Sequence, residues 1–340
     1  MKRAEPGRTG PGGSGTATGE RPSAREDAAG ERSAGVRPAR GGRTHRNAQM
    51  RRAPWLLLAP FVVVFFFAFL LPIAYAVVQS FVRVERQGLF GEEGISSTFA
   101  GVGNYAAALD NAEFVASIGR VLLFGVVQVP VMIVFATVLA LLLETASARW
   151  PAFFRATYFM PYGVPGVIAT ILWSFLYLPG LSPVVDVAEA VGISIDFLGP
   201  GVVLWSIANI VTWTYTGYNM LIIVAQLKSI PGDIYEAARM DGAGTWRIAG
   251  SIQLPMIRPA LMLATVFSII GTLQLFAEPQ VLQSVSPAIN NDYTPNLSAY
   301  NSAFNYNDYG VAAAQSVIIA LAAFVLSFTF LRLVNRKEKL

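Results

Sequence analysis

Two apolar segments of the sequence carry hydroxyl, amide and carboxyl groups at helical spacing. Tyr215 and Asn219 lie four residues apart in one segment, and Gln274 and Glu278 lie four residues apart in the other, so each pair shares a helix face. Amides and a carboxylate beside aromatic rings suit a polyol, because hydroxyls take the hydrogen bonds and C–H faces lie on the rings. The candidate substrate-pathway residues are Tyr215, Tyr218, Asn219, Gly271, Gln274, Phe276 and Glu278.

These polar groups lie within segments apolar enough to enter a membrane, where polar side chains are costly. They therefore face either a cavity or a partner helix, and hydrogen bonding between packed helices is the alternative to substrate binding. No Lys or Arg falls in the middle of any apolar segment, so a phosphate group would lack a counter-ion here. The residues favour a neutral sugar over glycerol phosphate.

A second candidate site is the charged segment 230–259, which lies between two apolar segments and reads IPGDIYEAARMDGAGTWRIAGSIQLPMIRP. Pro231 suits the first turn of a helix, and Gly242 is typical of a helix C-terminus. A second short helix is expected over 245–252, ended by Pro255. A structured segment of this length is longer than a simple connection needs, which favours a docking surface.

The first helix of this segment has a small apolar face. Ala237 and Ala238 follow Ile234 by three and four residues, so another surface can approach the backbone closely. Glu236 and Arg239, at i and i+3, can pair on the flank. Packing of the segment on its own membrane helices is the alternative to docking on another protein.

Several classes of chemistry are excluded by what the sequence lacks. The phosphate-binding pattern GxxxxGK[ST] is absent, because none of the four lysines follows a glycine. There is no cysteine, and the single histidine, His45, lies among Arg and Thr near the N-terminus. We therefore expect no enzyme, no metal, no cofactor on this chain and no ATP hydrolysis by this chain alone.

The composition predicts an all-α membrane protein. Of 340 residues, 54% are hydrophobic and 14% charged, against about 25% charged in soluble domains. A hydrocarbon core of about 30 Å needs about 20 apolar residues in a helix, and backbone groups in lipid must pair internally. Six predicted transmembrane helices cover 55–82, 117–143, 153–178, 202–227, 260–281 and 311–334, and Pro161, Gly163, Pro165 and Gly166 are expected to interrupt or bend the third.

The distribution of positive charge predicts the orientation. Residues 1–53 hold twelve Lys and Arg but five Asp and Glu and scarcely an aliphatic side chain, which predicts a disordered, basic, cytoplasmic tail ahead of a transmembrane domain over 54–340. The connections after the third and fifth predicted helices carry no Lys or Arg, whereas the alternate connections and the C-terminus are basic. Both termini and the segment 230–259 are therefore expected in the cytoplasm, with lipid as a partner and no nucleic acid.

The segment 230–259 resembles the EAA loop of ABC-importer permeases. The motif is carried by EAA at 236–238, DGA at 241–243 and I-x-L-P ending at Pro255, with WxxxGYNM from Trp213 upstream. GVGNY at 101–105 and further stretches before the third and sixth predicted helices resemble the sugar-type branch, the maltose and glycerol-phosphate permeases. The resemblance covers about residues 54–335.

The resemblance implies a type I ABC importer permease architecture with a cytoplasmic coupling helix. This helix would dock on a separate cytoplasmic ABC ATPase dimer, which holds ATP and magnesium, in a bacterial cell membrane. A second permease, expected to be a different chain, and an extracytoplasmic substrate-binding protein would complete an importer that works by alternating access. The implied ATPase-coupling residues are Tyr235, Glu236, Ala237, Ala238, Asp241, Gly242, Ala243, Leu254 and Pro255.

One position departs from the family pattern. An Asn-Thr pair is expected near the start of the second predicted helix, where this chain has Gly119 and Arg120. Arg120 is close enough to the membrane surface for its guanidinium to reach water; contact with the binding protein or substrate is the alternative. An ion-coupled secondary transporter is a less favoured reading, since no clear repeat is visible and the only acidic candidate is Glu278. Import of glycerol phosphate or another polyol also stays open.

Overall fold

The computed structural model describes residues 57–86, 95–145, 149–192 and 194–336. It divides into two compact units, Met1–Val62 and Val63–Leu340, and only the helical residues 57–62 of the first unit are described. The predicted tail over 1–53 lies outside the described residues. All further elements belong to the second unit.

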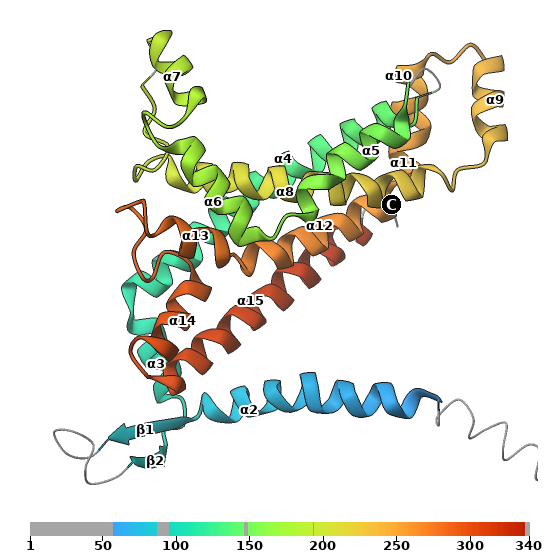
Figure 1. The fold of residues 1–340 in the computed structure, drawn as a ribbon. Coiled ribbons are helices and arrows are strands. Elements are labelled where there is room, and N and C mark those ends of the chain that lie inside the picture. Colours follow the sequence, from blue (N-terminus) through green and yellow to red (C-terminus); the bar gives the residue numbers. More distant parts are fainter. Residues whose placement is uncertain (1–56, 87–94, 146–148, 193, 337–340) are drawn as a thin grey trace, which may run out of the picture. The chain divides into compact units, whose positions relative to one another are not determined.

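The second unit is built mainly of long helices (Figure 1). These are α4 (Ala112–Leu143), α6 (Gly166–Tyr177), α8 (Val203–Leu227), α12 (Arg258–Leu273) and α15 (Tyr309–Arg336), together with α2 (Leu71–Gln79), which continues the helix that starts at Leu57. Shorter helices are η1 (Phe66–Leu70), α3 (Gly103–Asp110), α5 (Pro151–Phe159), η2 (Met160–Gly163), α7 (Pro183–Ala190), α9 (Gly232–Met240), α10 (Thr245–Ile248), η3 (Ala249–Gln253), α11 (Leu254–Met256), α13 (Ala277–Leu282) and α14 (Pro295–Phe304).

A two-stranded antiparallel hairpin interrupts the helical fold. Strands β1 (Val82–Arg86) and β2 (Ile95–Phe99) pair with Val82 opposite Phe99. The first predicted transmembrane helix therefore ends at Gln79 rather than at 82. β-branched residues in these stretches favour an extended chain. The prediction of a helix over 55–82 did not use this local signal.

By length and composition, four of the described helices can cross a membrane: Leu57–Gln79, Ala112–Leu143, Arg258–Leu282 and Tyr309–Val334. The pair Pro151–Gly163 and Gly166–Tyr177 gives a fifth span if it is counted as one, with a bend of 95°. The expected interruption of the third helix is thus confirmed. The segment 202–227 forms α8, whose 25 residues are long enough but contain many polar side chains, so the sixth span stays a prediction.

Helix boundaries differ from the prediction where local capping decides them. α4 begins at Ala112, five residues before the predicted start, because the Asn111 side chain accepts hydrogen bonds from the amides of Glu113 and Phe114. The expectation that Pro255 ends the second helix of the cytoplasmic segment is wrong. The chain passes through the π-helix η3 and continues as α11 to Met256, where Pro255 sits in a first turn that needs no amide from it.

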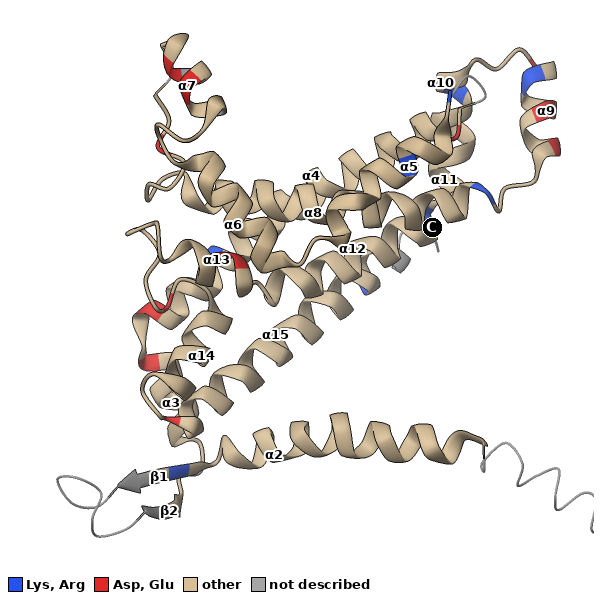
Figure 2. Ribbon diagram, viewed as in Figure 1, with Lys and Arg blue, Asp and Glu red and all other residues tan. Residues whose placement is uncertain are grey.

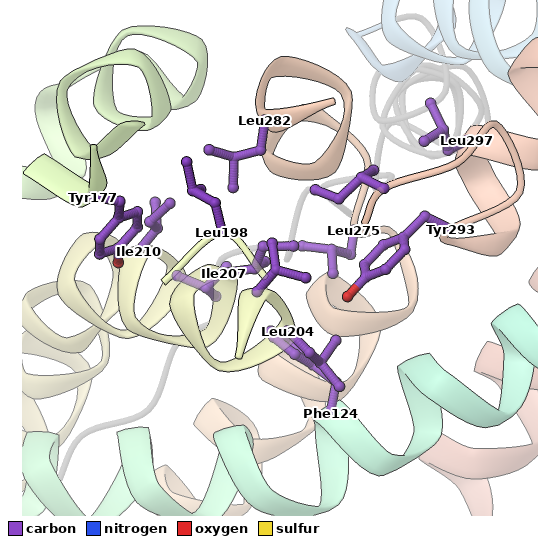
Figure 3. Packing of buried hydrophobic residues seen from close by; sticks show 13 residues of the cluster. Phe124, Tyr177, Leu198, Leu204, Ile207, Ile210, Leu275, Leu282, Tyr293 and Leu297 are labelled. Carbon is purple, nitrogen blue, oxygen red and sulfur yellow. The ribbon is translucent and has the colours of Figure 1, made fainter. Parts of the chain in front are cut away.

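Two buried apolar clusters hold the long helices together. One joins α4, α6, α8, α13 and α14 through residues such as Phe124, Ile207 and Leu282 (Figure 3). The other packs α4 against α8 and includes Met220, with Ile230 and Ile257 from the two ends of the charged segment. Charged residues gather at the helix ends and in the short helices, and the middle of α15 carries none (Figure 2).

Candidate functional site

A cavity of about 600 Å³ lies among α4, α8, α12, α13 and the bend between η2 and α6. Both apolar segments that carry the polar candidates contribute to its wall. The structure brings all seven together there: Tyr215, Tyr218, Asn219, Gly271, Gln274, Phe276 and Glu278. Their joint placement follows from helical spacing on α8 and from the chain around the end of α12.

Three tyrosines form one wall of this cavity. Tyr162, from η2, stacks on Tyr218 with ring centroids 4.8 Å apart and meets Tyr215 edge-on at 5.8 Å. Tyr162 reaches this place because the chain leaves the helix at Pro161 and re-enters one after Pro165. The break in the third predicted span therefore inserts an aromatic ring into the site, and stacked rings of this kind accept the C–H face of a ligand.

Gly217 allows α8 to touch the chain around this bend. A β-carbon at Gly217 would lie 1.9 Å from the Tyr158 carbonyl oxygen and 2.9 Å from Phe159 Cα. Only glycine permits such an approach of two backbones. The glycine of the WxxxGYNM stretch is thus a packing residue. It lets α8, which carries Tyr218, lie close to the bend that carries Tyr162.

Two of the residues that line the cavity are buried amides whose oxygens are unpaired. Gln128 is 2% exposed and donates to Thr212 Oγ1 at 3.3 Å, while Asn219 is also 2% exposed and donates to the Tyr215 carbonyl at 3.2 Å. Their carbonyl oxygens, Gln128 Oε1 and Asn219 Oδ1, have no hydrogen-bond partner among the described residues. A buried acceptor without a donor is costly, so a ligand hydroxyl at these oxygens would be stabilised.

The helix break at Gln274, Leu275 and Phe276 forms another wall. α12 ends at Leu273 and α13 begins at Ala277, which frees backbone carbonyls that a continuous helix would use. Asn296 Nδ2 donates to the Leu273 carbonyl at 2.9 Å, and Thr294 Oγ1 donates to the Leu275 carbonyl at 3.0 Å. The break is therefore a paired, fixed feature, and it turns two side chains toward the cavity.

Among the described residues that line the cavity, Glu278 is the only one with an ionisable acidic or basic side chain. It opens α13 close to Gly166, where a β-carbon would lie 4.0 Å from Glu278 Oε1. Within the described part of the chain, Arg155 and Glu144 form an ion pair at 3.0 Å, and no ion pair involves Glu278. The carboxylate is thus available to accept hydrogen bonds from a ligand and repels an anion.

Sequence reasoning missed four lining residues that carry a polar side-chain group: Gln128, Tyr162, Ser268 and Thr272. Gln128 was visible as a lone amide in the apolar run of the second predicted helix. Tyr162 could be placed only once the bend was known to turn inward. Ser268 and Thr272 read as ordinary small polar residues of a membrane helix, where Ser268 indeed donates to the Ala264 carbonyl at 2.8 Å.

The charged segment 230–259 folds as a hairpin of helices that is exposed over much of α9 and anchored by buried residues such as Ile230 and Ile257. α9 ends in a Schellman motif: the amide of Ala243 donates to the Ala238 carbonyl at 2.9 Å, and that of Gly242 donates to the Arg239 carbonyl at 3.0 Å. Gly242 has φ +77°, a conformation that favours glycine. The predicted end of the first helix is confirmed here.

The proposed docking residues fall into exposed and anchored groups. Glu236, Ala237, Asp241, Gly242, Leu254 and Pro255 are exposed, and Ala238 and Ala243 are half-buried. Tyr235 instead packs with Ile234 against the cluster of α4 and α8, and its hydroxyl accepts from Gln253 Nε2 at 3.4 Å. The expected ion pair of Glu236 with Arg239 is not among the ion pairs of the described residues. Tyr235 therefore anchors the helix whose free face Glu236 and Ala237 present.

Arg120 ties the start of α4 to the loop before α14. Its Nη1 donates to the Tyr293 carbonyl at 2.6 Å, and its guanidinium lies 4.5 Å from the centroid of the Tyr293 ring. Burial raises the pKa of Tyr293, and the Arg120 charge acts in the opposite direction. Arg120 is not among the lining residues of the cavity, so its contacts describe a structural tie.

Comparison with known proteins places this arrangement in a family. The sequence pattern of the family described as "binding-protein-dependent transport system inner membrane component" matches residues 132–339. The lactose transport system permease protein of Rhizobium radiobacter is 32% identical over 281 residues, which cover 81% of this chain and 91% of the relative. The sn-glycerol-3-phosphate transport system permease protein of Agrobacterium fabrum is 30% identical, covering 84% of this chain and 95% of the relative.

A solved structure has the same fold. A chain of a bacterial ABC transporter involved in the import of the acidic polysaccharide alginate aligns with a TM-score of 0.71 at 19% identity. The alignment covers 86% of this chain and 98% of the other. The architecture predicted from the sequence is thereby confirmed at the level of the fold.

Proposed function

Because the chain belongs to the family of binding-protein-dependent transport system inner membrane components, we propose that it forms half of the pathway by which an importer moves a neutral mono- or oligosaccharide. The family consists of permease subunits of ABC importers, so the chain is a multi-pass inner-membrane permease of the sugar type and not an enzyme. ATP is hydrolysed on a separate subunit of such importers.

The observation that carries the proposal is the chemistry of the cavity. Its lining includes the buried amides of Gln128 and Asn219, the carboxylate of Glu278 and the rings of Tyr162 and Tyr218. Acceptors for hydroxyls beside aromatic faces match a saccharide. No Lys or Arg lines the cavity within the described residues, so an anionic substrate would meet one uncompensated negative charge.

The helical hairpin of residues 230–259 supplies a candidate docking surface for the ATPase. Glu236, Ala237 and Gly242 lie on an exposed surface that is anchored to the membrane helices by Tyr235. We place the ATPase dimer, with its ATP and magnesium, on this surface. A second permease would complete the pathway and an external binding protein would deliver the sugar, with both termini of this chain in the cytoplasm. ATP-driven closure of the dimer would then move the cavity between inward-open and outward-open states.

The substrates in the relatives' names differ in charge, and this difference defines the test. One is named for lactose and another for sn-glycerol-3-phosphate. The complete importer in proteoliposomes, with its own binding protein, should take up a neutral saccharide from a panel of galactose, lactose and maltotriose in an ATP-dependent manner. It should leave glycerol 3-phosphate outside. ATP-dependent uptake of glycerol 3-phosphate alone would overturn the proposal, as would uptake that follows an ion gradient and ignores ATP.

A further inference from the structure

A second cavity shares a wall with the first. It has a volume of about 830 Å³ and lies among α2, α14 and α15. Gln274 and Phe276, the residues of the break between α12 and α13, line both cavities. We propose that this second cavity binds a further sugar unit, so that the permease accepts a neutral saccharide of at least two units lying across the break. The inference rests on the proposed function.

Aromatic rings lead from the second cavity to the shared wall. Phe276 and Tyr300 have ring centroids 5.2 Å apart, and Tyr300 and Phe304 have centroids 4.8 Å apart. Tyr300 and Phe304 lie four residues apart on α14, so they share one helix face. The result is a continuous row of three rings, with the innermost one facing the first cavity as well.

Two of these rings are accessible from the second cavity. Tyr300 is 37% exposed and Phe304 is 62% exposed, although both line a concave space. Within that space Tyr309, from the first turn of α15, adds a further half-exposed ring. Rings that face a cavity can each cover the C–H face of one pyranose, and a row of them suits a chain of such units.

Polar groups at the edge of the rings complete a site for hydroxyls. Gln274 is exposed at the shared wall. Asn296 uses its amide nitrogen to bond the Leu273 carbonyl, which leaves its oxygen as an acceptor. None of the described residues that line the second cavity is charged. The site therefore suits a neutral polyol, as the first cavity does, and offers nothing specific to a phosphate or a carboxylate.

The two cavities together indicate the length of the substrate. A single sugar ring in the first cavity would contact Phe276 from one side and leave Tyr300 and Phe304 unused. A linked second unit can stay in contact with Phe276 while it covers Tyr300. Residues on α14 should therefore contribute to recognition of oligosaccharides but not of monosaccharides.

The test compares uptake of galactose, lactose and maltotriose by the complete importer carrying Tyr300→Ala or Phe304→Ala. For lactose or maltotriose, the ratio of maximal rate to half-saturating concentration should fall about fivefold, the size expected when one stacked ring is lost. Uptake of galactose should stay within about twofold of wild type, because no α14 ring is needed for it. Since the binding protein is unchanged, each variant-to-wild-type ratio reports on the permease.

Two further variants separate recognition from folding. Tyr300→Phe keeps the ring and should keep oligosaccharide uptake, while Phe324→Ala removes an exposed ring of α15 that lies outside the second cavity and should change nothing. Equal losses for galactose and the longer sugars, no loss at all, or a wild type that imports only galactose would overturn the inference. Import of glycerol 3-phosphate and of no saccharide would instead overturn the proposed function, so the two failures are distinct.

Discussion

At the scale of single residues, the geometry of the cavity depends on a glycine that touches no substrate. The backbones of α8 and of the bend after α5 meet at Gly217, with no room for a methyl group. The tyrosines that line the cavity come from both sides of this contact. Replacement of Gly217 must separate the two backbones and, with them, Tyr162 from Tyr218.

Gly217→Ala is expected to destabilise the protein and to reduce uptake. Forcing a methyl group into a filled space costs about 1–3 kcal/mol and more where the neighbour is backbone. The measurement is the midpoint of thermal unfolding of the purified chain in detergent. Gly119→Ala, in α4, is the matched control, because a β-carbon there meets nothing within 4 Å. Equal midpoints for the two variants would contradict the close approach.

Glu278 is expected to set the preference for uncharged substrates. Glu278→Gln removes the negative charge and one strong acceptor, so the half-saturating concentration for the imported sugar should rise about tenfold or more. Discrimination against glycerol 3-phosphate should weaken at the same time. Uptake kinetics of both compounds give the comparison, with Glu189→Gln on the exposed face of α7 as control. A variant with unchanged sugar kinetics would show that the carboxylate does not face the substrate.

At the scale of elements, the hairpin of α9 and α10 depends on one left-handed residue. Gly242 has φ +77°, whereas Gly244, two residues on, has φ −73°, and a β-carbon added at either position would meet nothing within 4 Å. The two glycines thus differ in backbone conformation, but both have room for a β-carbon. They form a matched pair for a test of coupling.

Gly242→Ala should uncouple ATP hydrolysis from transport, and Gly244→Ala should not. A side chain in the left-handed region costs about 1–2 kcal/mol, which shifts the end of α9 and the exposed face that carries Glu236. The readouts are ATPase stimulation by the loaded binding protein and sugar uptake in the reconstituted complex. If both variants stay coupled, the hairpin does not transmit the movement; if both fail, backbone conformation is not the cause.

The elements also show what the sequence could predict. Apolar length and Lys/Arg placement indicate long membrane helices, and the prolines around Pro161 indicate the bend, because both signals are local. The inward position of Tyr162 and the helix break at Gln274 depend on contacts with distant segments. One such contact is the hydrogen bond from Asn296 Nδ2 to the Leu273 carbonyl. No local pattern contains that information. The continuation of the helix through Pro255 was mispredicted because the preceding π-turn was not foreseen.

At the scale of the whole molecule, the proposed orientation can be measured directly, because the sequence contains no cysteine. A single cysteine at Met240, the last residue of α9 and 88% exposed, is expected on the cytoplasmic side. One at the exposed Glu189 of α7 is expected on the external side. A membrane-impermeant maleimide should label Glu189→Cys in intact cells. Met240→Cys should react only after permeabilisation. The reverse pattern would invert the proposed topology and remove the hairpin from the ATPase.

The polar wall of the cavity also has a consequence for biogenesis. α8 is not among the four clear spans, and its polar side chains include Tyr215, Tyr218 and Asn219 at the cavity. An isolated α8 should therefore partition poorly into a bilayer. α4 is synthesised before α8. Its Gln128 donates a hydrogen bond to Thr212 of α8, and its apolar residues pack against α8.

We expect α8 to enter the lipid together with α4. Fusion of each segment to a glycosylation reporter would show this as low insertion of 203–227 alone and efficient insertion when 112–143 precedes it. Efficient insertion of α8 on its own would contradict the dependence. The polar residues of α8, which include those suited to hold a sugar, would thus make assembly of the bundle a condition for membrane insertion of this helix.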